Sequence, residues 1–249
     1  MNTIKEFGTK FKKIKEMEWI KSISHDTSSV GLTFEKLLGK KIDQSSKPDF
    51  YDIEIKCKLK DAYHNQFITL FNANPDNQPG EPERIRKLYG YPDKDYKQFK
   101  VFNISIYGNY KMHLSNHLFF NININYKEEM IYLNIIDKQH LNTDTQTSWS
   151  FSLLKEKIEQ KIKLLAFIEV EKKKHLNTNY YKYNKATIYK FKDFGAFLKL
   201  IEENKIRITF KVGIRKNKDR LGTSYNHGIG FDLRIDSIEE LFQKIEIFT

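Results

Sequence analysis

Hydrophobic and polar residues alternate over many short stretches of this chain, whereas a 3.6-residue hydrophobic period is confined to a few. Alternation predicts half-buried strands, and the longer period predicts helices. Strands are expected at residues 51–57, 67–71, 101–107, 118–126, 130–136, 166–170, 180–189, 206–214 and 229–235. Helices are expected at residues 4–19, around 32–38, and at 153–165, 194–201 and 238–245. The pattern therefore predicts a mixed α+β (α/β) protein in which strands outnumber helices.

Turn-forming residues divide these elements. Residues 72–82 contain Asn74-Pro75 and Pro79-Gly80, which favour a loop, and residues 89–96 form a second loop. The polar run 137–148 and the charged run 171–179 are the best candidates for a boundary between two lobes.

Composition narrows the class of protein. The 249 residues include 43 Lys and Arg against 32 Asp and Glu, a formal net charge of +11, so a polyanionic partner is expected. Cys57 is the single cysteine, which excludes an internal disulfide and a thiolate zinc site and fits a reducing cytosol. No stretch approaches the roughly 18 apolar residues that span a bilayer, so no membrane partner is expected.

The most informative segment runs from Pro48 to Lys56. Alternation in its second half places Asp52, Glu54 and Lys56 on one face of a strand and the apolar residues on the other. Two carboxylates and an ammonium group then project together.

Hydrolysis of a phosphodiester requires oxygen ligands that hold Mg²⁺ against a phosphate oxygen. Asp49 and Glu54 can supply a carboxylate pair, with the backbone carbonyl of Ile55 as a further ligand. Lys56 can orient the attacking water or stabilise charge on the phosphorus. Asp52 is a rival metal ligand because it shares a face with Glu54.

The alternative is that these residues form surface ion pairs of little energetic value. A Glu-x-Lys tripeptide alone is common in a lysine-rich chain. Its context favours the catalytic interpretation, because Pro48-Asp49 precedes it and a short helical segment bearing Glu35, from Gly31 to Gly39, comes before that.

These segments resemble the MvaI/BcnI-type restriction endonucleases, relatives of the mismatch-repair nicking enzyme MutH among the PD-(D/E)xK nucleases. Residues 31–39 are similar to the glutamate-bearing helix of that family, and residues 48–56 to its catalytic strand. Further similarity lies at residues 70–71, 86–90, 137–139, 149–151, 180–184 and 226–228. The resemblance covers most of the chain from about Gly31 onward.

The resemblance implies a nuclease-like catalytic core, a mixed central sheet flanked by helices, and a smaller β-rich C-terminal recognition lobe. We place the catalytic lobe at residues 1–170 and the DNA-recognition lobe at 171–249. It also implies that Asp49, Glu54 and Lys56 are catalytic, with Glu35 as the helix-borne glutamate.

As expectations from the same resemblance, the enzyme is a Mg²⁺-dependent monomer in the bacterial cytoplasm that cuts double-stranded DNA at a short CC-N-GG-like site. A DNA methyltransferase encoded nearby would protect the host. Only four residues separate Asp49 from Glu54, fewer than in MutH, which favours the restriction branch.

Base reading is expected in a glycine-bearing loop between two predicted strands, where cations, amides and an imidazole are mixed. The candidate DNA-binding residues are Arg215, Lys216, Arg220, Tyr225, Asn226, His227, Asp232 and Arg234. His227 and Arg234 could equally be a loop histidine and a strand-face ion pair. At Asp232 the family comparison would lead us to expect arginine, and an aspartate accepts from cytosine where an arginine donates to guanine.

Two alternatives stay open. One is a MutH-like endonuclease that nicks a single strand during mismatch repair. The other is a basic DNA-binding module without catalysis. Against the second, carboxylates close to DNA phosphates would repel them unless a metal ion offset their charge.

Overall fold

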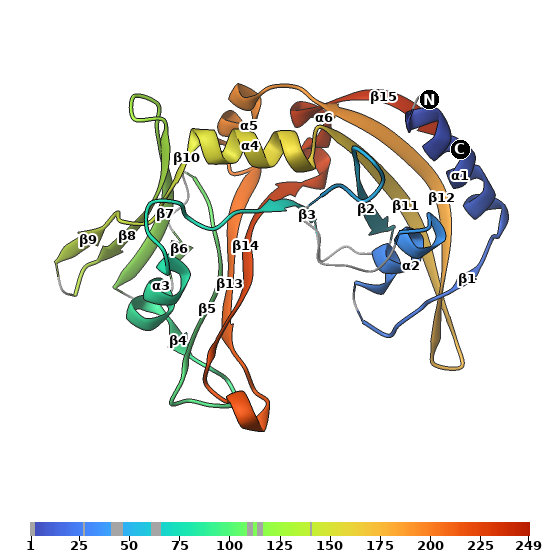
Figure 1. The fold of residues 1–249 in the computed structure, drawn as a ribbon. Coiled ribbons are helices and arrows are strands. Elements are labelled where there is room, and N and C mark those ends of the chain that lie inside the picture. The colour runs from blue at the N-terminus through green and yellow to red at the C-terminus, as the bar shows by residue number, and fades with distance from the viewer. Residues whose placement is uncertain are drawn as a thin grey trace. The chain divides into compact units, whose positions relative to one another are not determined.

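The computed structural model describes residues 3–26, 28–40, 47–60, 66–108, 112–113, 117–139 and 141–249. The chain divides into two compact units, each discontinuous in sequence (Figure 1). Unit 1 comprises Met1–Ile68, Ile158–Lys192 and Ile238–Thr249, and unit 2 comprises Thr69–Lys157 and Asp193–Ser237. In the described part of the chain, no helix is long and apolar enough to cross a membrane.

Unit 1 is built around a mixed five-stranded sheet. Its elements are α1 (Thr3–Glu16), β1 (Ile20–Lys21), α2 (Ser29–Leu37), β2 (Ile53–Leu59), β11 (Leu164–His175), β12 (Thr178–Phe191), α6 (Ile238–Leu241) and β15 (Phe242–Phe248). The strand order is β1-β12-β11-β2, and β15 also pairs with β12. Only the β2–β11 pair is parallel among the pairs described in this sheet, with Ile53 opposite Leu164.

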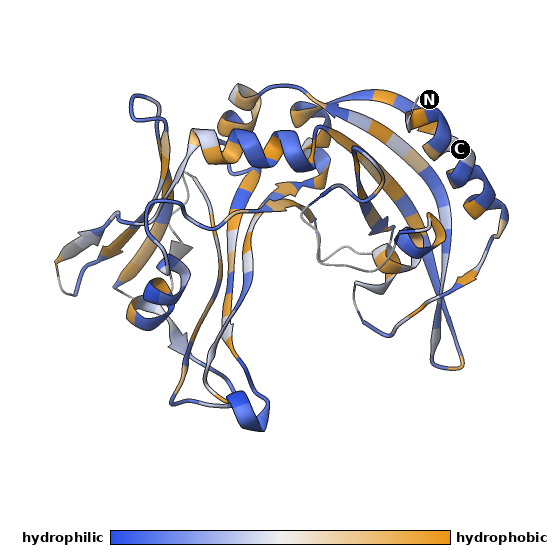
Figure 2. Ribbon diagram, viewed as in Figure 1, coloured by the Kyte–Doolittle hydropathy of each residue, from blue (hydrophilic) through white to orange (hydrophobic). Residues whose placement is uncertain are grey.

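The core of unit 1 lies between this sheet and helices α1 and α2. Phe7, Phe11 and Ile14 are buried along one face of α1, at the spacing that a helix requires. They pack in one cluster with Phe34 of α2 and with Ile53 and Ile55 of β2, among other residues. Alternating apolar and polar positions along the strands of the sheet are visible in Figure 2.

Unit 2 contains two further sheets. Its strands are β3 (Phe67–Asn72, beginning at the end of unit 1), β4 (Tyr91–Pro92), β5 (Lys100–Ile106), β6 (Met112–His113), β7 (Leu118–Asn125), β8 (Met130–Asp137), β9 (Asn142–Asp144), β10 (Ser148–Ser150), β13 (Ile206–Ile214) and β14 (Ser224–Arg234). Its helices are α3 (Glu81–Tyr89), α5 (Phe194–Glu202), and the 3-10 turns η1 (Lys218–Arg220) and η2 (Ile235–Ser237). Helix α4 (Phe151–Lys161) starts in unit 2 and ends in unit 1.

The sheets of unit 2 have the orders β10-β8-β7-β6, with β9 beside β8, and β3-β14-β13-β5-β4. Trp149 is fully buried, lies against the rings of Phe210 and Phe231, and donates its indole N–H to the carbonyl of Ala73 at 3.0 Å. Asp193 caps α5 by accepting the N–H of Ala196 at 2.8 Å.

The predicted strands are all present, and the mixed α+β class is confirmed. Some local predictions are wrong. The helix expected at 238–245 ends at Leu241, and the chain continues as β15, which pairs with β12. The charged run at 171–179 is the β11–β12 hairpin, with His175 opposite Thr178, and lies inside unit 1. The expected boundary near residue 170 therefore does not coincide with the division into units.

Candidate active site

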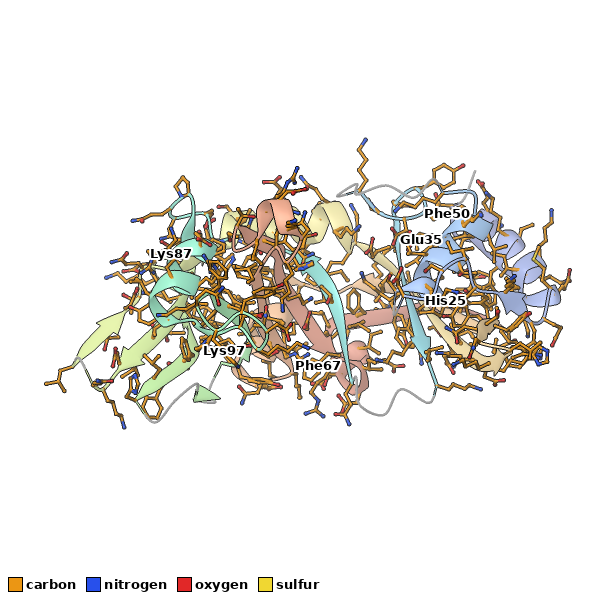
Figure 3. All side chains as sticks on the ribbon, turned by 90° about the horizontal axis from the view of Figure 1, so that it is seen from below. His25, Glu35, Phe50, Phe67, Lys87 and Lys97 are labelled. Carbon is orange, nitrogen blue, oxygen red and sulfur yellow. The ribbon has the colours of Figure 1, made fainter. Side chains whose placement is uncertain are left out.

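The candidate catalytic residues all belong to unit 1 and meet at β2, the edge strand of its sheet. Ile53 and Ile55 enter the core, so the alternation of the strand turns Glu54 and Lys56 to the other face. Asp49 comes from the loop before β2, where Phe50 and Ile53 exchange backbone hydrogen bonds of 3.0 and 2.8 Å. The labels Glu35 and Phe50 in Figure 3 mark this part of the unit.

Asp49 is tied to the strand that carries the other residues. Its Oδ2 accepts the backbone N–H of Ile55 at 3.0 Å, and its Oδ1 lies 2.5 Å from the ammonium group of Lys40. Asp52, the rival ligand predicted from the sequence, is exposed in the preceding turn. The geometry therefore favours Asp49 over Asp52 as the partner of Glu54.

Glu54 is almost completely buried, with 3% of its side chain exposed, and is held by two lysines. Lys56 Nζ lies 2.7 Å from Oε1, and Lys161 Nζ lies 2.8 Å from Oε2. Lys161 also donates to the carbonyl of Lys47 at 2.9 Å. The loop that carries Asp49 and the carboxylate of Glu54 are thus connected through one ammonium group.

Glu35 faces this group from α2. Lys40 Nζ lies 3.7 Å from Glu35 Oε2, so Lys40 is close to both Glu35 and Asp49. Three carboxylates, Glu35, Asp49 and Glu54, are accordingly matched by three ammonium groups, those of Lys40, Lys56 and Lys161.

The environment shifts the pKa values of the carboxylates in different directions. Burial raises the pKa of Glu54, and the negative charge of Asp49 raises it further. Lys56 and Lys161 offset this increase only in part. Burial and the charge of Asp49 likewise raise the pKa of Glu35. Burial opposes ionisation of Asp49 too, but the hydrogen bonds from Lys40 and Ile55 outweigh it and lower its pKa.

The donor set suits a hard divalent cation. Across the residues that the structure describes, no three His, Cys, Asp or Glu side chains are grouped as metal ligands. A cation here would be held by Asp49 and Glu54, with the carbonyl of Ile55 and water completing its shell. Mg²⁺ is commonly bound in this way, through one or two carboxylates with retained waters.

Sequence reasoning missed Lys40 and Lys161. Neither stands in a motif, and Lys161 reaches Glu54 only because β11, which follows it, runs parallel to β2. Lys40 follows Gly39, a helix-ending glycine, and that local signal could have indicated that the chain turns back beside Glu35.

The predicted DNA-binding residues lie in unit 2, on and near the β13–β14 hairpin. Arg215 stacks over the ring of Tyr225 at 4.4 Å, and the rings of Tyr225 and His227 are 4.1 Å apart. The structure therefore brings these three together. Arg220 lies in η1 between the strands and is exposed.

The other predicted residues have protein partners. Asn226 donates to Asn74 Oδ1 at 3.2 Å and accepts the N–H of Gly228 at 2.8 Å. Lys216 pairs with Asp93 at 2.9 Å and Asp95 at 2.7 Å. At the far end of β14, Arg234 pairs with Asp236.

Asp232 is engaged by side chains within the sheet of unit 2. It is buried, with 4% exposed, and its carboxylate accepts from Thr69 at 2.7 Å and Thr209 at 2.8 Å, with Arg207 at 3.4 Å. Both carboxylate oxygens of Asp232 accept hydrogen bonds from neighbouring strands, so this geometry gives the side chain a structural role in the sheet. Alternation alone could not distinguish a buried aspartate from an exposed one.

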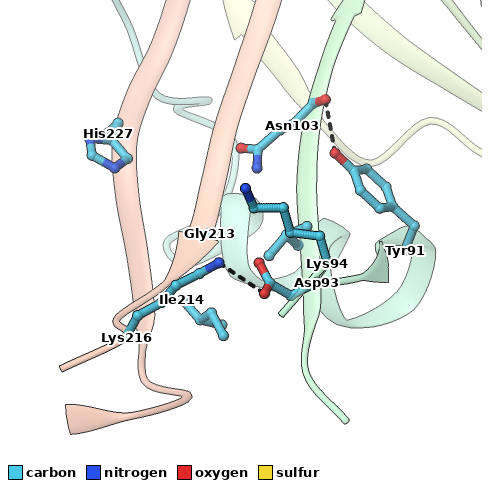
Figure 4. A pocket seen from close by; sticks show the side chains of 9 residues that line it. Tyr91, Asp93, Lys94, Asn103, Gly213, Ile214, Lys216 and His227 are labelled. Carbon is cyan, nitrogen blue, oxygen red and sulfur yellow. Dashed lines mark hydrogen bonds and ion pairs between the residues drawn. The ribbon is translucent and has the colours of Figure 1, made fainter. Parts of the chain in front are cut away.

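A cavity of about 400 Å³ lies beside this hairpin (Figure 4). It is lined by Tyr91, Asp93, Lys94, Val101, Asn103, Gly213, Ile214, Lys216 and His227. Lys94 and Asn103 add polar groups to the cavity that His227 also lines, and sequence reasoning did not single them out. Lys216 and Asp93 join the hairpin to the loop after β4.

Comparison with known proteins identifies relatives over nearly the whole chain. A family model described as the MvaI/BcnI restriction endonuclease family matches residues 8–242. The structure titled "Restriction endonuclease MvaI-cognate DNA substrate complex" matches with a TM-score of 0.89 at 26% identity, covering 100% of this chain and 99% of that chain. The structure of the same endonuclease in the absence of DNA matches with a TM-score of 0.62 at 27% identity, covering 100% and 98%. No curated protein sequence matches the chain.

Proposed function

The chain belongs to the MvaI/BcnI restriction endonuclease family, and we propose that it is a type II restriction endonuclease whose unit 1 hydrolyses phosphodiester bonds of double-stranded DNA. The observation that carries the chemistry is the group formed by Asp49, the buried Glu54 and Lys56 at the edge of the sheet. The similarity over 100% of the chain to an endonuclease solved with its cognate DNA supports DNA as the substrate.

Metal dependence is general among restriction endonucleases, and for this chain we propose Mg²⁺. When bound, Mg²⁺ neutralises the phosphate and activates water for attack. Asp49 and Glu54 would hold it, together with the Ile55 carbonyl, because these are hard oxygen donors brought together by the hydrogen bond from Ile55 to Asp49.

We assign to Lys56 the role of the group that acts on the reacting atoms. Its ammonium group is held 2.7 Å from Glu54, with 22% of its side chain exposed, so it is oriented and still reaches solvent. It would orient the attacking water and stabilise negative charge on the phosphorus. Glu35 would add a further carboxylate beside Asp49.

For recognition, we propose that unit 2 contacts DNA through Arg215, Arg220, Tyr225, Asn226 and His227 of the β13–β14 hairpin. The proposed target is a short pseudosymmetric site of the CC-N-GG type. We also propose that the enzyme acts as a monomer, because one chain supplies every residue of the proposed active site. A methyltransferase encoded nearby would then protect host DNA.

The test is cleavage of supercoiled plasmid DNA of known sequence by the purified protein, with Mg²⁺ and with EDTA. Discrete fragments are expected with Mg²⁺ only, and Lys56→Ala should reduce their formation roughly 10³-fold while DNA binding persists. Lys36→Ala, on the exposed face of α2, is the matched control. A stable nicked circle would instead favour a strand-nicking enzyme, and an intact plasmid that still binds protein would favour a non-catalytic module.

A further inference from the structure

The four carboxylate oxygens proposed to hold the metal each lie close to a protein nitrogen in the structure. Lys40 contacts Asp49 Oδ1 and the N–H of Ile55 contacts Oδ2. Lys56 contacts Glu54 Oε1 and Lys161 contacts Oε2. A divalent cation must therefore replace or share at least one of these contacts.

Lys40 is the contact most suited to exchange. The N–H of Ile55 belongs to a strand backbone and cannot move away alone, and Lys56 is assigned to the reacting atoms. Lys161 is held at the same time by the carbonyl of Lys47 at 2.9 Å. Lys40 stands on a side chain with several rotatable bonds, so its ammonium group can move relative to Asp49. It also has Glu35 as an alternative partner, now at 3.7 Å.

A helix-ending motif at the C-terminus of α2 positions Lys40 next to Asp49. Gly39 has a φ of 90° and donates to the carbonyl of Lys36 at 3.0 Å, and the N–H of Lys40 donates to the carbonyl of Glu35 at 3.0 Å. This pair of hydrogen bonds is the Schellman arrangement, which reverses the chain after a helix. The end of α2 thus holds Lys40 beside Glu35 and Asp49.

Resting on the proposed function, we propose that Lys40 is a built-in counter-cation that occupies the metal's place at Asp49 in the metal-free enzyme and competes with the divalent cation for it. Without metal, the ammonium group offsets the repulsion between the clustered carboxylates. When the cation binds, Lys40 releases Oδ1 and turns toward Glu35. Lys40 is accordingly a positioning residue that sets the affinity for metal.

The experiment measures Ca²⁺ binding to the metal-free, full-length protein by calorimetry, with no cleavage involved. Lys40→Met should bind Ca²⁺ about tenfold more tightly than wild type, which is the change expected if the contact occupies Asp49 about nine-tenths of the time. Lys40→Arg keeps the charge and should remain close to wild type. Lys36→Met removes the same charge from an exposed site on α2 and should leave Ca²⁺ affinity unchanged.

A double-mutant cycle separates direct competition from a general effect of charge. In an Asp49→Asn background, Lys40→Met should no longer tighten Ca²⁺ binding, because the shared ligand has been removed. If it tightens binding equally there, the competition is not at Asp49 and the proposal is overturned.

Thermal unfolding gives a second measurement. In EDTA, Lys40→Met should unfold about 3 °C below wild type, and saturating Ca²⁺ should close that gap. Lys40→Gln serves if the methionine variant does not fold. Equal or weaker Ca²⁺ affinity in a folded Lys40→Met or Lys40→Gln variant, or no Ca²⁺ binding in either the variant or the wild type, would overturn the proposal. Intact Mg²⁺-dependent plasmid cleavage in that case would leave the proposed function standing.

Discussion

Lys161 at the end of α4 places its ammonium group 2.8 Å from Oε2 of Glu54 on β2. Lys56 approaches the other oxygen of the same carboxylate at 2.7 Å. Two lysines from distant parts of the chain therefore fix both oxygens of a nearly buried glutamate. Because Lys161 also bonds the carbonyl of Lys47, it connects Glu54 to the loop that carries Asp49.

Replacing Lys161 should impair the active site without removing a group that acts on DNA. We expect Lys161→Met to reduce cleavage about 10- to 100-fold, the usual cost of losing a group that orients a metal ligand. Loss of its charge should raise the pKa of Glu54 further, because Lys161 opposes the effect of burial. The acid limb of the pH–rate profile should consequently move to higher pH.

Lys157→Met, on the same helix, is the matched control for charge and helix propensity. It should leave both the cleavage rate and the profile unchanged. A Lys161 variant with a wild-type profile would show that Lys161 does not act through Glu54.

Asp232 provides a prediction about stability. Asp232→Asn should lower the free energy of unfolding by about 1–3 kcal/mol, because a buried carboxylate that accepts from Thr69 and Thr209 would be replaced by an amide with two donor hydrogens. Urea unfolding measures the change. The pattern of DNA fragments should stay the same, since both carboxylate oxygens of Asp232 already accept hydrogen bonds within the sheet.

Asp236→Asn is the corresponding control at an exposed position. Its carboxylate pairs with Arg234 and is 61% exposed, so its loss should cost less than about 1 kcal/mol. A changed target sequence in Asp232→Asn would contradict the structural assignment.

How much of the fold and site can be predicted from the sequence depends on how far apart the contacting residues lie along the chain. Alternation predicts β2 and the faces of its side chains, because the period of a strand is local. Asp49, Glu54 and Lys56 are close in sequence, so one motif gathers them. Lys161 joins the site through the parallel pairing of β11 with β2, where Leu164 lies opposite Ile53, and no local pattern encodes that register.

Two local patterns also misled. Ile238, Leu241 and Ile245 have helical spacing, but Ile245 and Ile247 alternate on β15, where pairing with β12 prevails over the helical period. Helix α3 begins at Glu81, directly after Gly80 at a φ of 85°, inside a segment that its prolines and glycine mark as a loop. The pairing with β12 is a tertiary contact that a single sequence does not show, whereas the start of α3 carries a local signal, because Pro82 lies in its first turn and proline is favoured there.

Replacing Lys216 and replacing Arg220 in the β13–β14 loop should change the salt dependence of DNA binding by different amounts. Each phosphate contact contributes about 0.9 to the slope of log affinity against log salt concentration. Arg220→Met should reduce the magnitude of that slope by about 0.9, the contribution of one phosphate contact, because Arg220 is exposed. Lys216→Met should lower it less, since Lys216 is already paired with Asp93 and Asp95. Equal changes in binding assays from low to high salt would contradict this distinction.

Stability of the metal-free protein should depend on pH with opposite signs at Glu35 and Asp49. The pKa of Glu35 is raised above its usual 4.5 by burial and by Asp49, so the native state binds more protons than the unfolded state just above pH 4.5. Stability is therefore lost as pH rises through that window, and Glu35→Gln should gain stability relative to wild type over the same range.

The pKa of Asp49 is lowered below its usual 3.8, despite burial, by the hydrogen bonds from Lys40 and Ile55. Its contribution is present above pH 3.8 and is lost as pH falls through the lowered value, so Asp49→Asn should be less stable than wild type at neutral pH. Urea unfolding in EDTA between pH 3 and pH 8 measures both differences, and a Glu35→Gln difference that shrinks as pH rises would refute the assignment.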